Sequence, residues 1–127
     1  MVNKIRLEDL EAAVKSLQRA LEQPKDEFVR DSAIQRFEFC FELSWKVAQK
    51  ILQQFGVTAT SPRSAILEMH QQGWIPSSES WLKFLDDRNL TVHTYREDLA
   101  QEIFDRIPLF LVEEKKLLEK FKSLVKS

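Results

Sequence analysis

Hydrophobic residues recur at every third or fourth position along most of the chain, a spacing that places them on one face of an α-helix. A first amphipathic segment keeps this spacing over residues 7–21, and Pro24 ends it soon afterwards. A second segment keeps it through about six turns over residues 34–55, where Gly56 follows as a C-terminal stop. The first half of the chain therefore predicts two long helices.

The second of these segments is apolar on more than one face. Beside its main apolar stripe it carries Phe39, Cys40, Leu43 and Val47. The polar stripe that remains is narrow and consists of Gln35, Glu38, Glu42, Lys46, Gln49 and Gln53. Such wide apolar coverage predicts burial on two sides. Within the polar stripe, Lys46 follows Glu42 by four residues, so an ordinary salt bridge is the favoured explanation of the charges.

Caps and glycines predict three further helices. The pair Ser61–Pro62 is typical of an N-cap and a first helical residue, and opens a short helix to about Gln72. Ser77 or Ser78 caps a fourth helix that runs toward Val92.

A local sequence motif predicts the start of the last helix. Residues 94–97, Thr-Tyr-Arg-Glu, match a capping box, which places a helix boundary at 93–94 and starts a helix at Tyr95. The helix continues through Phe121. Pro108 lies inside it, where the missing amide should kink or interrupt the helix.

Four long helices and one short one, joined by brief connections, predict an all-α fold, an up-and-down four-helix bundle with one additional short helix. Proline and glycine residues occur singly between the segments, so residues 1–127 are expected to form one domain. Nine Phe and three Trp are many for this length. The apolar surplus of the second helix is easier to bury against a partner than inside one small bundle, and we therefore expect a homodimer.

Composition narrows the possible functions. The net charge is −1 and the pI is about 6.1, so the chain carries no basic coat for non-specific nucleic-acid binding, and any RNA contact must be local. Cys40 is the only cysteine, which excludes an intramolecular disulfide and fits a reducing cytoplasm. The N-terminus is charged and no segment is long and apolar enough to span a bilayer, so neither export nor membrane insertion is expected.

Standard motifs for common chemistries are missing from the sequence. It has no glycine-rich phosphate loop, no Cys-x-x-Cys pair, no His-Glu-x-x-His and no nucleophile elbow. His70 and His93 are the two histidines, and neither has a second ligand at a spacing that would share a helical face. We therefore expect neither a metal nor a cofactor.

Residues 86–95, Asp-Asp-Arg-Asn-Leu-Thr-Val-His-Thr-Tyr, gather the groups that cleave RNA without a metal. That reaction needs a base for the 2′-hydroxyl proton, an acid for the leaving oxygen and a cation for the phosphorane charge. His93 is suited to the proton transfers, and the guanidinium of Arg88 to the phosphate oxygens. Asn89 can orient the arginine or the substrate, while Tyr95 can stack on a base or bind phosphate.

Two features leave this interpretation open. Residues five apart on a regular helix are separated by about 140° of rotation, so Arg88 and His93 do not share a face. A relaxed helix end, or a two-fold dimer that combines both copies in one cleft, would remove the difficulty. Alternatively, Arg88 forms an ion pair with Asp86, Asp87 or Glu97, and His93 simply ends a helix.

The chain resembles the HepT-like HEPN proteins, also called nucleotidyltransferase substrate-binding proteins. The resemblance covers nearly the whole chain and depends on two stretches, residues 30–46 and residues 88–95. The second stretch matches the family's Arg-x4-His-x-Tyr pattern without departure.

This resemblance implies a toxin of a type VII-like toxin–antitoxin module. It would be a metal-independent endoribonuclease acting on tRNA or mRNA, with Arg88 and His93 as its catalytic pair. Its partner would be a minimal nucleotidyltransferase antitoxin that transfers AMP from ATP to Tyr95. The bulky anion added there would exclude RNA from the cationic cleft.

Two other functions compete with this one. The older family name treats such bundles as non-catalytic substrate-binding subunits that complete the active site of a separate nucleotidyltransferase. Arg88 and His93 would then bind a substrate or a partner. The third possibility is a plain interaction bundle.

Overall fold

Five α-helices and one 3₁₀ turn make up the described part of the chain. The structure, a computed structural model, describes residues 5–125. Its elements are α1 (Glu8–Leu21), α2 (Glu27–Gln54), α3 (Pro62–Gln71), α4 (Ser78–Leu90), the 3₁₀ turn η1 (Thr91–His93) and α5 (Glu97–Val125). The described residues contain no strand. The predicted all-α bundle with one additional short helix, α3, is confirmed.

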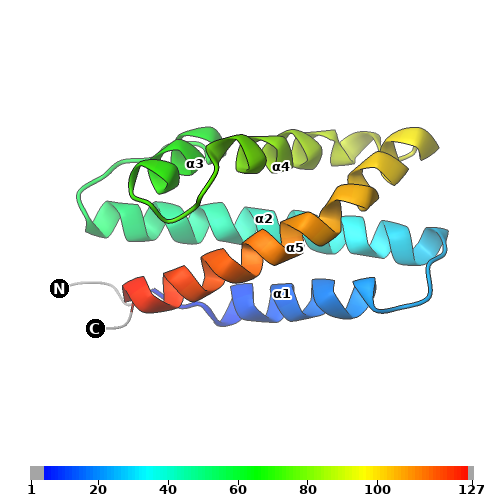
Figure 1. The fold of residues 1–127 in the computed structure, drawn as a ribbon, viewed down its shortest axis with the longest axis horizontal. Helices are drawn as coiled ribbons and strands as arrows, with labels where there is room; N and C mark the ends of the chain where they lie inside the picture. Colours follow the sequence, from blue (N-terminus) through cyan, green and yellow to red (C-terminus); the bar gives the residue numbers. More distant parts are fainter. Residues whose placement is uncertain (1–4, 126–127) are drawn as a thin grey trace.

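The long helix α2 runs through the middle of the bundle. In Figure 1, α1 lies along one side of α2, α3 and α4 follow one another along the other side, and α5 crosses obliquely from the end of α4 toward the start of α1. α2 contacts each of the other four α-helices. The predicted burial of α2 on two sides is therefore confirmed, although Phe39 faces solvent.

The predicted helix starts and stops are mostly confirmed. Ser61 and Ser64 form a reciprocal capping box at the start of α3, and Ser77 caps α4 by accepting the Ser80 N–H. Gly56 and Gly73 end the preceding helices with φ of 80° and 79°, a left-handed conformation that favours glycine.

The start of α2, at Glu27, is earlier than the apolar pattern from residue 34 predicted. The Asp26 side chain accepts the Val29 N–H at 2.7 Å and caps the helix. In the additional turns the apolar Phe28 is exposed and the charged Arg30 is buried, so apolar spacing does not reveal these turns as helical.

The predicted start of α5 is wrong. The helix begins at Glu97 rather than Tyr95 because the capping box does not form. The Glu97 carboxylate accepts from Arg30, and the Thr94 hydroxyl donates to the Thr91 carbonyl instead. The interruption expected at Pro108 does not occur either. α5 is continuous, and Pro108 lies on its exposed side.

Aromatic side chains from α2, α4 and α5 form the centre of the core. The Phe110 ring packs edge-on against Phe37 and Phe84, with centroid distances of 4.8 and 5.2 Å. Trp81 completes the cluster, at 5.7 Å from Phe110. Such contacts favour edge-to-face geometry because the ring edge is positive and the ring face negative. Trp74, Trp81 and Cys40 are all buried.

One carboxyl group lies inside this core. Glu114 is fully buried on α5, where its Oε1 accepts from the Ser44 hydroxyl of α2. Its Oε2 and the Trp81 Nε1 are buried without a hydrogen-bond partner among the described residues. Burial raises the pKa of Glu114 to about 8, so the side chain is mainly neutral at pH 7. Burial also raises the pKa of the neighbouring Cys40 thiol.

Candidate active site

The residues predicted to carry chemistry lie where α4 ends and the chain turns toward α5. Arg88 and Asn89 lie in the last turn of α4, His93 ends η1, and Tyr95 lies in the turn before α5. The structure thus brings Arg88, Asn89, His93 and Tyr95 to one end of the bundle.

The backbone between Arg88 and Tyr95 is held by short local hydrogen bonds. The Thr91 hydroxyl donates to the Arg88 carbonyl at 2.7 Å, and the Arg96 N–H donates to the His93 carbonyl at 3.0 Å. The chain leaves the α-helical path after Leu90 and tightens into η1. The angle calculated for a regular helix therefore does not describe the relation between Arg88 and His93.

Arg88 is held by its neighbour and by α2. Its Nη1 donates to the Asn89 Oδ1 at 3.0 Å, so the amide contacts the arginine. Its Nη2 donates to both carboxylate oxygens of Glu42, with the Oε2 at 2.8 Å. The Phe41 ring lies beneath the guanidinium, 6.0 Å from its carbon, and adds a cation–π contact.

The partners expected for these charges from sequence were wrong. Arg88 forms its ion pair with Glu42 instead of Asp86, Asp87 or Glu97. The salt bridge predicted between Glu42 and Lys46 is replaced by bonds from Arg88 and from the Trp45 indole to Glu42. The partner of Arg88 was missed because it lies 46 residues earlier in the chain. Sequence spacing identifies partners within one helix but not across a bundle.

His93 and Tyr95 face each other on the surface. The His93 Nδ1 lies 3.3 Å from the Tyr95 Oη, within reach of a hydrogen bond, and the rings meet edge to face at 5.9 Å. The Tyr95 side chain is 78% exposed. In the part of the chain described, Arg88 and His93 make no hydrogen bond to each other. The phenol that the family resemblance assigns to modification is thus accessible and adjacent to the histidine.

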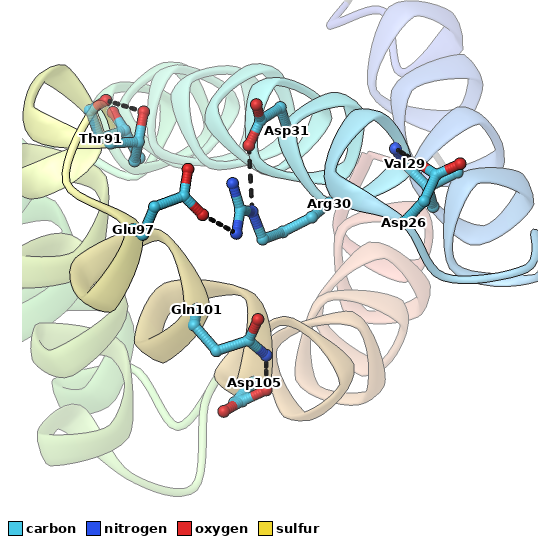
Figure 2. Close-up of polar contacts among 9 residues, drawn as sticks. Asp26, Val29, Arg30, Asp31, Thr91, Glu97, Gln101 and Asp105 are labelled. Atoms are coloured by element: carbon cyan, nitrogen blue, oxygen red, sulfur yellow. Dashed lines mark hydrogen bonds and ion pairs between the residues drawn. The ribbon is translucent and has the colours of Figure 1, made fainter.

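A buried arginine on α2 bonds to the first residue of α5, just after the turn that carries Tyr95. Figure 2 shows Arg30 extending from α2 toward Glu97, with Asp31 on its other side. The hydrogen bond to Glu97 raises the pKa of Arg30, and the same contact lowers the pKa of the Glu97 carboxyl. Sequence reasoning missed this link, since Arg30 stood out only as part of a family-like stretch.

A second ion pair fixes α4 against α5. Asp87, one residue before Arg88, is buried and accepts two hydrogen bonds of 2.7 Å from Arg106. Both contacts are charge-assisted and bidentate, which gives them a defined geometry. The last turn of α4 is thereby fixed to α5 through Asp87, while Arg88 faces α2.

Among residues 5–125, no group of three or more His, Cys, Asp or Glu side chains could hold a metal ion. None of the helices described combines the length and apolar character needed to cross a membrane.

Known proteins resemble this chain over most of its length. Residues 5–123 match the family described as "Nucleotidyltransferase substrate binding protein like". The chain is 32% identical over 139 aligned residues to a probable ribonuclease HepT of Haemophilus influenzae, covering 96% of this chain and 95% of that protein.

Three solved structures share the fold. A Thermus thermophilus protein has 35% identity and a TM-score of 0.83, covering 88% of this chain and 98% of that one. A Haemophilus influenzae protein, described as revealing the fold of a substrate binding domain of a nucleotidyltransferase, has 29% identity and a TM-score of 0.81, covering 92% and 99%.

The third structure is a tri-AMPylated HEPN toxin of Shewanella oneidensis in complex with an MNT antitoxin. It has 20% identity and a TM-score of 0.71, covering 92% of this chain and 93% of that one, and at that identity it shows the fold alone. The match of the family model over nearly the whole chain, together with the Haemophilus relative, shows that the chain belongs to the HepT-like HEPN family of nucleotidyltransferase substrate-binding-like proteins.

Proposed function

We propose that this protein is the toxin of a type VII-like toxin–antitoxin module and acts as a metal-independent endoribonuclease on tRNA or mRNA. The observation that carries the proposal is the convergence of Arg88, His93 and an exposed Tyr95 at one end of the bundle in a HepT-like chain. The probable-ribonuclease description of the Haemophilus relative supports the same chemistry.

His93, Arg88 and Asn89 each have a role in the proposed cleavage. His93 takes the proton of the RNA 2′-hydroxyl, whose oxygen attacks the adjacent phosphorus, and the bond to the 5′-oxygen breaks as that oxygen gains a proton from an acid. Arg88 neutralises the charge that develops on the phosphorane oxygens. Asn89 supports Arg88 through the bond to its Nη1. The products are a 2′,3′-cyclic phosphate and a 5′-hydroxyl.

A homodimer would complete this site. Base and acid are both needed, and each chain brings one histidine to this end of the bundle. A two-fold axis beside η1 would place His93 and Arg88 of both copies in one cleft, so that one histidine takes a proton while the other supplies one.

Nucleotidylation of Tyr95 would silence the toxin. The Tyr95 Oη would attack the α-phosphorus of ATP as pyrophosphate leaves and the phenolic proton is lost. The new phosphodiester would place a negative charge at the oxygen that now lies 3.3 Å from the His93 Nδ1. It would exclude RNA by size and repel its phosphates. The enzyme that catalyses this transfer from ATP would be a minimal nucleotidyltransferase antitoxin, as the Shewanella complex of a tri-AMPylated HEPN toxin with an MNT antitoxin suggests.

Bacterial growth tests both halves of the proposal. Cells would express wild type, Arg88→Ala, His93→Ala or Tyr95→Phe, each with and without the cognate nucleotidyltransferase. Wild type and Tyr95→Phe should arrest growth and both alanine variants should not, whereas the partner should rescue only wild type. His70→Ala, which changes the exposed histidine of α3, should behave as wild type in both conditions.

A second function is favoured by one observation. The Haemophilus structure at 29% identity is described as a substrate binding domain of a nucleotidyltransferase. In that case Arg88 and His93 bind the partner's substrate, and the protein cleaves no RNA. Harmless wild type, with every variant alike, would favour this binding subunit over the nuclease.

A further inference from the structure

The phenol of Tyr95 has one hydrogen-bond partner among the described residues, and that partner is the histidine of the candidate site. The Tyr95 Oη lies 3.3 Å from the His93 Nδ1. Glu97 and Asp98, the next carboxylates along the chain, each accept a hydrogen bond from an arginine. Within this chain, His93 is therefore the group placed to take a proton from the phenol.

Two short turns of the backbone bring these side chains together. Residues two apart on a regular helix do not face each other. Here the Thr94 hydroxyl donates to the Thr91 carbonyl at 3.0 Å, and the Arg96 N–H donates to the His93 carbonyl, also at 3.0 Å. The second bond closes a turn over residues 93–96, in which the two rings meet edge to face with centroids 5.9 Å apart. The turn that joins η1 to α5 therefore determines the contact.

Nucleotidyl transfer to a phenol needs a group that accepts the phenolic proton. A hydroxyl is a weak nucleophile while it keeps its proton, and a base within hydrogen-bond reach activates it. Before the second substrate binds, the hydrogen bond between a nucleophile and its base is often long, so a separation of 3.3 Å is compatible with this role. Tyr95 is also exposed, so a second protein can reach its oxygen.

We propose that His93 is the general base for nucleotidylation of Tyr95, so that the toxin supplies the proton acceptor for its own silencing. This inference rests on the proposed function. The phenolic O–H passes its proton to the His93 Nδ1 while a bond forms between the Tyr95 Oη and the α-phosphorus of ATP. The bond from that phosphorus to the bridging oxygen of the β-phosphate breaks, and pyrophosphate leaves with the electron pair. The imidazolium then releases its proton to water.

The two nitrogens of the imidazole separate this role from RNA cleavage. When Nε2 carries the ring hydrogen, Nδ1 accepts the phenolic O–H and is ready for the transfer to Tyr95. When Nδ1 carries it, the Tyr95 Oη accepts instead, and Nε2 is free to take the 2′-hydroxyl proton of RNA. A phenol both donates and accepts, so the one contact fits both tautomers. The same histidine therefore serves the toxin's reaction and its inactivation.

Two other arrangements lead to different results. In the first, the nucleotidyltransferase brings its own base and His93 is dispensable. In the second, His93 only orients the phenol through the hydrogen bond, and another acceptor at that position suffices. Glutamine separates orientation from proton transfer, because its amide oxygen accepts a hydrogen bond but does not take up a proton near neutral pH.

The experiment measures the single-turnover rate of the first AMP addition by intact-mass spectrometry, with the cognate nucleotidyltransferase in excess and ATP and Mg²⁺ saturating. The substrates are wild type, His93→Ala, His93→Gln and Tyr95→Phe, all made in a cell-free system that lacks the nucleotidyltransferase. His70→Ala is the matched control, since it removes the exposed histidine of α3. Circular dichroism checks that each variant is folded. Because the readout is the mass of the toxin, it does not depend on RNA cleavage.

His93→Ala and His93→Gln should both slow the addition at least about 100-fold. The nucleotidyltransferase concentration that gives half the maximal rate should stay within about twofold of wild type. Added imidazole should restore part of the rate in His93→Ala, where the missing ring leaves room for it. His70→Ala should match wild type, and Tyr95→Phe should gain no AMP.

Three results would overturn the inference and leave the proposed function intact: a wild-type rate in His93→Ala, recovery of that rate in His93→Gln, or a residual rate in His93→Ala that imidazole does not raise. If wild type gains no AMP, or if Tyr95→Phe gains it as fast as wild type, the proposed silencing through Tyr95 itself fails.

Discussion

Arg30, near the start of α2, donates a 2.7 Å hydrogen bond to the carboxylate of Glu97, the first residue of α5, 67 residues later in the chain. The pair joins the starts of the two longest helices, directly after the turn that carries Tyr95. The arginine side chain is buried while the glutamate is exposed, so the charge of the buried arginine is paired with a carboxylate at the surface.

Removal of Arg30 should loosen the start of α5. In Arg30→Met the apolar stem is kept but Glu97 loses its partner, and amide exchange at residues 95–100 should accelerate about tenfold relative to that in α1. Hydrogen exchange followed by NMR measures this. Arg6→Met, which removes an exposed ion pair with Glu8, serves as the control and should leave these rates unchanged. Equal exchange in wild type and Arg30→Met would show that the helix start is held by other contacts.

The same pair should make part of the stability depend on acid. Its hydrogen bond with Arg30 lowers the pKa of Glu97 below 4.5 in the folded state. The stabilisation is therefore present at neutral pH and is lost as pH falls through the folded pKa. The stability difference between wild type and Arg30→Met should accordingly shrink below about pH 4.

Glu114 should act in the opposite direction. Its pKa is about 8 in the folded protein and near 4.5 when exposed, so between these values the folded state binds the extra proton. Stability should therefore fall as pH rises from about 4.5 to about 8. Glu114→Gln should remove this decline and exceed wild type by roughly 1–4 kcal/mol at pH 8.5.

Urea unfolding at pH 5 and pH 8.5 measures that difference. Glu119→Gln, a change at an exposed carboxylate of the same helix, should leave the pH dependence as in wild type. Wild type should lose more stability between pH 5 and pH 8.5 than Glu114→Gln does. An equal loss in the two proteins would contradict a neutral buried carboxyl.

Pro108 should cost stability even though it does not interrupt α5. Its ring crowds the carbonyl of Phe104, and it has no N–H to donate there. Since Pro108 is exposed, alanine leaves no cavity, and Pro108→Ala should raise the free energy of unfolding by roughly 1–3 kcal/mol. Thermal unfolding compares it with Lys115→Ala on the same helix, which should change stability by less than about 0.5 kcal/mol. A lower melting temperature for Pro108→Ala would mean that the proline is accommodated without strain.

The sequence predicted those parts of the fold that depend on local signals. Serine caps and single glycines act within a few residues, so both ends of α3 and the C-terminal end of α2 could be predicted. The capping box at Thr94 failed because Glu97 has a stronger partner in Arg30, far away in sequence. Local motifs cannot report such competition.

The candidate site was predictable in its residues but not in its contacts. Arg88, His93 and Tyr95 lie within one short segment, so their side-chain types and spacing are enough to suggest a shared site. Glu42 and Trp45 come from the next layer of the bundle, and their polar groups look like an ordinary solvent-facing stripe until α2 is placed beside α4. The placement of helices, which depends on the whole core, supplies this part of the site.

RNA cleavage by protein made in a cell-free system that lacks the cognate nucleotidyltransferase tests the central proposal most directly. Wild type, His93→Ala and Arg88→Ala would be incubated with tRNA and a transcribed mRNA in excess EDTA. The proposed function predicts cleavage by wild type with 2′,3′-cyclic phosphate ends, and a loss of at least about 100-fold in both variants. Intact RNA with wild type, or equal cleavage by His93→Ala, would contradict it.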